Sequence, residues 1–245
     1  MIKTILIFIY TSVVMVILIP IGFIPMLLYF FGLRKSMSLV LYRLVQAWAL
    51  SIVKLTGARV TVTGRENIIK NSGICFVSNH GGYFDIVLLL AYSGRPFGFI
   101  AKKELMLLPF INFWIYILGG IFIDRGNVRK AIRTINKGVK RIKSGSGMLI
   151  FPEGHRSKGR GLLPFHPGSL KLATSAEAPI VPVAIKGSYD VFEKNYRIVS
   201  AAVKVSFLER IETASIPAEE RKLALSDRIF SVIKEELEEA ESNVS

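Results

Sequence analysis

Cysteine is nearly absent from this chain: Cys75 is the only one among 245 residues. No disulfide can form within the chain, so nothing in the sequence indicates an oxidising compartment. Cys75 lies in a short apolar run, Ile74 to Val77, which is typical of a buried strand, and we interpret it as a small core residue. Histidine is also scarce, and neither His155 nor His166 has an acidic neighbour at the spacing of a metal site. We predict no bound metal and no other cofactor.

Charge is missing from a long stretch near the N-terminus. No Asp, Glu, Lys or Arg occurs from Thr4 to Leu33, and Arg34 and Lys35 follow at once. A cleaved signal peptide is disfavoured, because no small-residue cleavage site precedes these cations and the apolar run is too long. Two interpretations remain, which are a single spanning helix and a broken pair of helices that enters one leaflet and returns.

Pro20 favours the broken pair. A helix from Thr4 to Ile19 is about 24 Å long, which is short of the roughly 30 Å hydrocarbon core. Pro20 also removes a helix hydrogen bond at the natural corner, after which Ile21 to Leu33 would return. We therefore predict a monotopic two-helix anchor at the cytoplasmic face of a membrane, with the spanning helix as the alternative. Residues 1–57 form this membrane-anchoring part, and residues 58–245 form one α/β domain.

Acidic residues are few: the chain has 18 Asp and Glu against 32 Lys and Arg, a net charge of +14. Nucleic acid is the general interpretation of such a balance, but the distribution argues against it. Asn127 is a candidate N-cap for an amphipathic helix from Val128 to Lys143, whose polar faces are basic. Beside an apolar anchor, these cations suit anionic lipid headgroups, at about 1 kcal/mol per cation. They equally suit a phosphate-bearing substrate or carrier.

Short apolar runs alternate with helical patterns over the rest of the chain. Strands are predicted at Arg59–Thr63, Ile74–Ser78, Phe97–Ala101, Ile121–Asp124, Met148–Phe151, Val181–Ile185 and Ala202–Phe207. Helices are predicted at Met37–Leu55, Phe84–Ala91, part of Lys103–Leu118, Val128–Lys143, Ser169–Ser175 and after Pro217. Such alternation predicts an α/β fold with a central, largely parallel sheet of about seven strands flanked by helices.

His80 and Asp85 are the most informative pair of residues. They are five positions apart in Asn79-His80-Gly81-Gly82-Tyr83-Phe84-Asp85, a spacing that does not bring side chains together on one helix. The two meet only if His80 lies in the turn after a strand and Asp85 in the first helical turn that follows. A carboxylate that holds one ring nitrogen leaves the other to accept a proton, as in general-base catalysis. A helix-capping Asp beside an incidental surface His is the alternative.

Several other charged residues follow predicted strands in the same way. Ligands of parallel sheets bind beyond the carboxyl ends of the strands, so these residues should share one edge with His80. Arg125 and Arg156 suit a phosphate group, because a guanidinium matches phosphate oxygens with two hydrogen bonds. Lys102 and Lys103 would add positive charge, although at least one of them is expected to be a surface residue.

Three further segments follow the one from Asn79 to Asp85. They are Phe122-Ile123-Asp124-Arg125, Phe151-Pro152-Glu153-Gly154-His155-Arg156-Ser157 and Ile180-Val181-Pro182-Val183. In order and spacing the four segments resemble the motif blocks of the glycerolipid acyltransferases, the family of the 1-acyl-sn-glycerol-3-phosphate acyltransferases. The resemblance extends from about Gly64 to Gly187 and includes the tract from Phe165 to Ala173. One position departs from the family, because the third block usually has Thr where this chain has His155.

The resemblance implies transfer of a fatty acyl group from acyl-CoA or acyl-carrier protein to the sn-2 hydroxyl of 1-acylglycerol 3-phosphate (lysophosphatidic acid), giving phosphatidic acid in phospholipid synthesis. His80 would remove the hydroxyl proton while Asp85 holds its tautomer, without an acyl-enzyme. Backbone N–H groups near Gly81 and Gly82 are candidates for stabilising the oxyanion. The substrate-binding residues would be Arg125, Arg156, Glu153, Gly154, Lys102, Lys103 and Asn79.

Two alternatives remain from the sequence. The first is that the acceptor is glycerol 3-phosphate or another lysophospholipid, which the same base and phosphate-binding residues would serve. A non-catalytic basic protein that docks on anionic membranes or nucleic acid is the alternative from another class. The aromatic stretch from Leu105 to Leu118 has three possible roles that the sequence does not separate: core packing, an acyl-chain groove and insertion at the membrane interface.

Overall fold

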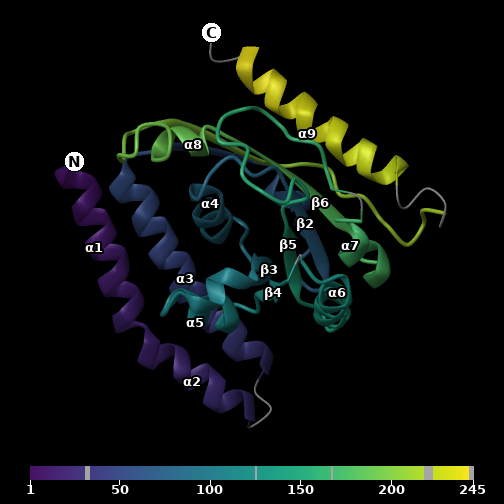
Figure 1. Cartoon of the computed structure of the whole chain (residues 1–245), viewed down its shortest axis with the longest axis horizontal. Helices are drawn as coiled ribbons and strands as arrows, with labels where there is room; N and C mark the ends of the chain where they lie inside the picture. Colours follow the sequence, from purple (N-terminus) through teal and green to yellow (C-terminus); the bar gives the residue numbers. More distant parts are fainter. Residues whose placement is uncertain (31–33, 125, 167, 218–222, 243–245) are drawn as a thin grey trace.

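The computed structural model describes residues 1–30, 34–124, 126–166, 168–217 and 223–242, with side chains described outside 25–38 and 241–242 (Figure 1). Seven strands form one sheet in the order β1-β7-β6-β2-β5-β3-β4. The strands are β1 (Arg59–Thr63), β2 (Ile74–Ser78), β3 (Phe97–Lys102), β4 (Ile121–Ile123), β5 (Gly147–Ile150), β6 (Ile180–Lys186) and β7 (Ala202–Phe207). The helices are α1 (Ile2–Ile17), α2 (Ile19–Phe30), α3 (Arg34–Thr56), η1 (Arg65–Asn67), α4 (Phe84–Tyr92), η2 (Lys103–Leu107), α5 (Ile111–Ile117), α6 (Val128–Lys143), α7 (Lys171–Ala176), α8 (Ser188–Val191) and α9 (Ala224–Ser242).

Strand direction puts the carboxyl ends of five strands at one edge. β6, β2, β5, β3 and β4 are parallel, whereas β7 is antiparallel to β6 and β1 is parallel to β7. The residues that follow β2, β3, β4, β5 and β6 therefore meet at the same edge, which we call the catalytic edge. The predicted α/β fold with a largely parallel sheet is confirmed.

Helices cover both faces of the sheet, and β2 shows why its sequence is apolar throughout. Phe76 packs into the core beneath α3, α4 and α5, whereas Cys75 and Val77 pack into the core beneath α6, α7 and α9. Successive strand residues point to opposite faces, so a strand that is covered on both sides needs a continuous apolar run. Cys75 is fully buried, as expected for a core residue.

The N-terminal helices differ from the prediction in where the chain reverses. Two apolar helices are present, but α2 continues onward from α1, and the return comes between α2 and α3 rather than at Pro20 (Figure 1). Pro20 occupies the first turn of α2, where a backbone N–H has no helical partner to lose. Proline at this position therefore starts a new helix and bends the path without turning the chain back.

α1 is bonded to the rest of the molecule along its length. Lys3 Nζ donates to the carbonyl of Thr56 at 2.9 Å, and the Tyr10 hydroxyl lies 2.7 Å from Ser51 Oγ on α3. Farther along, Trp114 Nε1 on α5 donates to the carbonyl of Met15 at 3.1 Å. By length and composition, two helical segments among the described residues suit a membrane, Ile2–Ile24 and Leu39–Thr56.

Candidate functional site

His80 and Asp85 meet at the catalytic edge as the sequence predicts. β2 ends at Ser78, His80 lies in the loop that follows, and Asp85 is in the first turn of α4. His80 Nδ1 and Asp85 Oδ2 are 2.8 Å apart, and Asp85 is fully buried. The same carboxylate oxygen accepts a hydrogen bond from Gly82 N at 3.0 Å. A carboxylate bound to Nδ1 places the ring proton there, which leaves Nε2 as the proton acceptor.

The segment after β5 holds His80 in place. Phe151 stacks on the imidazole, with ring centroids 3.9 Å apart and planes 12° from parallel. Glu153 Oε1 accepts from the backbone N–H of His80 at 2.6 Å, and Ser157 N donates to the His80 carbonyl at 2.7 Å. The main chain and the ring of His80 are thus both constrained, which is the preorganisation that a general base requires.

Glu153 lies beneath the edge and binds two backbone segments. It is fully buried, and its second oxygen accepts from Leu163 N at 3.0 Å. Burial raises the pKa of Glu153 to about 7, against the opposing effect of the N–H groups of His80 and Leu163. The family resemblance implies that this carboxylate is one of the substrate-binding residues. Its contacts favour a positioning role, because one oxygen accepts from the backbone of His80 and the other from the backbone of Leu163.

Arg156 belongs to a cluster that sequence reasoning did not identify in full. Its guanidinium forms an ion pair with Glu193 and lies 3.6 Å above the centre of the Tyr83 ring. Glu193 is nearly buried, and its other oxygen accepts from Tyr83 N at 2.5 Å, at the start of α4. Gly82 allows this approach, since a Cβ there would lie 2.3 Å from Glu193 Oε2. Glu193 thereby joins the arginine to the loop that carries His80.

The sequence feature that could have identified Glu193 is its position after β6. β6 is parallel to β2, so its carboxyl end reaches the same edge. Ligand-binding residues of parallel sheets follow the carboxyl ends of the strands, and the segment after Gly187 occupies such a position just as the segments after β2, β3, β4 and β5 do. Its acidic residue Glu193 is therefore a candidate on the same ground as the residues that the sequence predicts.

The remaining predicted residues occupy varied positions. Lys103 Nζ lies 3.0 Å from Asp124 Oδ1, and this hydrogen bond holds the pKa of Asp124 below its usual range. Lys102 is exposed at the end of β3. Asn79 is buried and exchanges two 2.8 Å hydrogen bonds with the backbone of Ile185, so it joins β2 to β6. Arg125 lies outside the described residues.

The glycines of the His80 loop differ in what their N–H groups can do. Gly82 N is already bonded to Asp85, so it is not available to an oxyanion. Of the two glycine donors that the sequence suggests, only Gly81 N–H remains a candidate. Gly154 has a φ of +74°, in the left-handed region that favours glycine, and its N–H bonds back to the carbonyl of Phe151 at 3.1 Å. This turn brings Arg156 and Ser157 back toward His80.

Comparisons with known proteins agree with this geometry. The family model described as Acyltransferase matches residues 59–186. A 1-acyl-sn-glycerol-3-phosphate acyltransferase of Borreliella burgdorferi is 34% identical over 141 residues, which are 58% of this chain and 56% of that protein. The Escherichia coli K12 protein of the same name is 31% identical over 172 residues, covering 69% of each chain.

A solved structure matches nearly the whole chain. The crystal structure of the 1-acyl-sn-glycerophosphate (LPA) acyltransferase PlsC from Thermotoga maritima is 26% identical, with a TM-score of 0.81, over 98% of this chain and 97% of that one. In sequence, however, the matched part of the chain spans only 56% of the Borreliella relative. It spans 54% of the Saccharomyces cerevisiae protein of the same name. Residues 59–186, which the family model matches, contain the four motif blocks and every contact of His80 described above. This chain therefore belongs to the acyltransferase family.

Proposed function

We propose that the chain is a 1-acylglycerol-3-phosphate O-acyltransferase. It transfers a fatty acyl group from acyl-CoA or acyl-carrier protein to the sn-2 hydroxyl of lysophosphatidic acid, and the product is phosphatidic acid for phospholipid synthesis. The observation that carries the proposal is the constrained imidazole of His80, which is bonded to buried Asp85 and faces the same edge as Arg156. The names of the matched relatives support the choice of acceptor.

His80 acts as the general base. Nε2 removes the proton from the sn-2 hydroxyl as the oxygen attacks the thioester carbonyl, and Asp85 stabilises the imidazolium that forms. The tetrahedral intermediate then expels the thiolate, which takes the proton back from Nε2 and leaves as the thiol. The acyl group moves directly from sulfur to oxygen, so this reaction needs no acyl-enzyme.

Arg156 binds the phosphate and sets the distance between the acceptor hydroxyl and His80. Its ion pair with Glu193 and its position over Tyr83 restrict the guanidinium before substrate arrives. Such a restricted group loses little conformational freedom on binding, so more of the interaction appears as affinity and orientation. Arg125 is proposed as a second phosphate ligand from its place in the second motif block alone.

α1 and α2 hold the protein on one leaflet at the cytoplasmic face of the membrane. α1 is bonded to α3 at Lys3 and Tyr10 and to the α/β domain at Met15, so its bonds lie near both ends and in the middle. A helix that crossed the bilayer would carry these attached parts of the domain into the hydrocarbon region, where their polar groups would lose hydration. Lying along the surface avoids this cost.

The test is an acyl-transfer assay with purified full-length protein. Acyl-CoA and acyl-carrier protein are compared as donors, and lysophosphatidic acid, glycerol 3-phosphate and a non-phosphorylated lysolipid are compared as acceptors. The proposal expects phosphatidic acid from the first acceptor and a turnover at least about 10²-fold lower from the His80→Ala variant. Preference for another acceptor would reassign the substrate, and absence of transfer with every pair would refute the enzyme.

A further inference from the structure

η2 and α5 carry a solvent-exposed apolar surface beside the catalytic edge. Leu107 is 84% exposed, which is extreme for a large aliphatic side chain. A single exposed apolar residue needs no explanation, but here the neighbouring residues in the chain are exposed and apolar as well. We call this surface the apolar ridge; it consists of Met106, Leu107, Leu108, Phe110, Ile111 and Tyr116.

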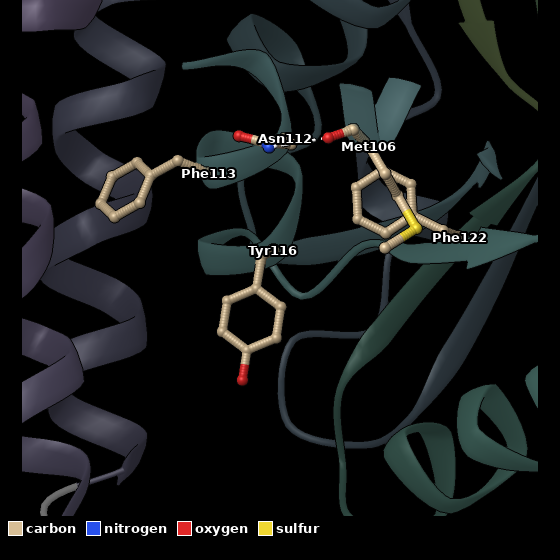
Figure 2. Close-up of a pocket in the computed structure, with 5 residues that line it drawn as sticks. All are labelled: Met106, Asn112, Phe113, Tyr116 and Phe122. Atoms are coloured by element: carbon tan, nitrogen blue, oxygen red, sulfur yellow. Dashed lines mark hydrogen bonds between the residues drawn. The ribbon is translucent and has the colours of Figure 1, made fainter. Parts of the chain in front are cut away.

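The backbone of the ridge is held in a defined shape. Asn112 Nδ2 donates to the carbonyl of Met106 at 2.9 Å, which ties the start of α5 to η2 (Figure 2). Phe110 has a φ of +64°, a conformation that non-glycine residues rarely adopt. Strained conformations of this kind persist where surrounding structure enforces them, and they accompany functional surfaces. The exposure of these side chains therefore comes from a defined loop geometry.

The ridge is continuous with the apolar surface of the N-terminal helices. Phe113 packs against Phe23 of α2 with ring centroids 5.1 Å apart, and in Figure 2 its ring points toward the N-terminal helices, away from Phe122. Trp114 donates to the carbonyl of Met15 on α1. Many α1 side chains beyond this contact are exposed and apolar, including Leu6, Ile9 and Val13. The three elements thus present one extended apolar surface.

Charge around the ridge indicates what kind of surface would cover it. Lys102 ends β3 and Lys103 begins η2, and both are exposed. Arg129 and Lys130 are exposed at the start of α6, which follows β4, the strand paired to β3. The helix richest in acids, α9, shares its sheet face with α6 but lies at the far corner from α2 in Figure 1. Cations beside exposed apolar residues match an anionic lipid surface, which attracts Lys and Arg while the apolar groups insert.

We propose that the apolar ridge inserts into the headgroup and upper acyl region of an anionic lipid leaflet, as a contact additional to α1 and α2. Leu107 is its tip, and Lys102, Arg129 and Lys130 bind the headgroups around it. The ridge directly follows β3, whose carboxyl end belongs to the catalytic edge. Insertion thereby brings the leaflet to the edge that holds His80, so a lipid acceptor reaches the base without leaving the membrane surface.

Site-specific fluorescence tests this insertion. Leu107→Cys in the full chain is labelled with nitrobenzoxadiazole, because burial of Cys75 raises the pKa of its thiol and keeps it from the reagent. Leu223→Cys is the matched control, since Leu223 is 66% exposed and precedes α9 on the opposite sheet face. On vesicles of phosphatidylcholine and phosphatidylglycerol, the probe at 107 should brighten, shift to the blue and be quenched by bromolipids, whereas the probe at 223 should not change.

Co-sedimentation separates the ridge from the anchor. If labelled protein sediments with vesicles while the probe at 107 stays in an aqueous environment, α1 and α2 hold the protein and the ridge proposal is overturned. Brightening without vesicles, together with a dimer mass by light scattering, would assign the ridge to a second copy of the chain and would overturn it equally. A probe that is buried equally on pure phosphatidylcholine would remove the anionic-headgroup part of the proposal.

A substitution tests the consequence for catalysis. Leu107→Asp should lower transfer to a vesicle-borne acceptor by about tenfold, because a charge replaces an inserted apolar side chain. Transfer to a short-chain, water-soluble acceptor should stay unchanged, and Leu223→Asp should affect neither. Equal losses with both acceptors would show that Leu107 serves the fold or the edge itself. Loss of all activity in the unmodified chain would refute the proposed function while leaving the fluorescence result to decide the ridge.

Discussion

The catalytic edge and the apolar ridge differ in how their functional side chains are held in place. At the edge, three buried carboxylates, Asp85, Glu153 and Glu193, accept backbone hydrogen bonds and fix the loop of His80. At the ridge, apolar side chains such as Leu107 remain in solvent. Proton transfer requires atoms placed to a fraction of an ångström, whereas partition into a fluid leaflet requires only apolar area. Mutations at the two regions should therefore differ sharply in size and kind of effect.

His80→Ala should give the largest change. Removing a general base lowers turnover by about 10²- to 10⁴-fold, and the loss should be seen in initial rates of phosphatidic acid formation. His166→Ala is the matched control, because His166 is exposed and makes no contact with His80 that the structure describes. Membrane binding should be the same in both variants. Turnover retained without His80 would remove the base assignment and the contrast between the two regions.

Glu153 should give the catalytic edge a pH dependence that the ridge lacks. Its pKa is about 7 in the fold against an ordinary 4.5, because burial disfavours the charged carboxylate. The stabilisation from its protonated form is fully present below pH 4.5 and is lost as pH rises through about 7. The linked change in unfolding free energy is about 3 kcal/mol.

The measurement is unfolding free energy against pH for the wild type and for Glu153→Gln. The variant should lose most of the decline between about pH 5 and 7, and it should be less stable at low pH because an amide cannot accept from both His80 N and Leu163 N. Leu107→Ser is the control at the ridge and should keep the wild-type slope. An unchanged slope in Glu153→Gln would show that another group titrates.

Glu193→Gln should have a smaller effect, directed at the phosphorylated acceptor. The amide oxygen still accepts from Tyr83 N, but the ion pair with Arg156 is lost. We expect the KM for lysophosphatidic acid to rise about tenfold, the equivalent of about 1.4 kcal/mol, with kcat little changed. Glu212→Gln breaks only the exposed pair with Arg210 and should have no effect. A fall in kcat with unchanged KM would mean that Glu193 acts on His80 instead.

Tyr10→Phe should give the smallest effect, at the contact between α1 and α3. It deletes the 2.7 Å hydrogen bond to Ser51 and should lower the unfolding free energy by about 1 kcal/mol. Denaturant unfolding in detergent measures this, and Tyr196→Phe, at a fully exposed ring, is the control. Acyl transfer should stay at the wild-type rate. A large loss of activity would indicate that docking of α1 shapes the catalytic edge, which would weaken the separation of the two regions.

Much of the secondary structure follows from local patterns. Seven predicted strands match the seven observed ones within a residue or two. The helix from Val128 to Lys143 has the predicted bounds, because Asn127 accepts from Lys130 N and caps it at 3.0 Å. These features depend on neighbours within a few positions. The short helix α8 was not predicted, since four residues carry too little periodicity to be recognised.

The site was only partly predictable. His80 and Asp85 are close in sequence, and the geometry of a strand, a turn and a helix is enough to bring them together. Glu193 and Tyr83 are 110 positions apart, and Glu153 and His80 are 73 apart. Neither contact has a local pattern, because each depends on which strands are neighbours in the sheet. The role of Glu153 as a support beneath His80 appears only once β2 and β5 are paired.

By itself the sequence determined the order of the strands along the chain, the pairing of base and carboxylate, the excess of cations and the uncharged N-terminal stretch. These are properties of residue types and their local spacing. Only the tertiary structure decided that the chain reverses after α2, that α1 docks along α3, and that buried carboxylates from the segments after β5 and β6 converge on one loop. Such contacts join distant segments, and they form because the sheet brings its carboxyl ends together and because burying a polar group without a hydrogen-bond partner is costly.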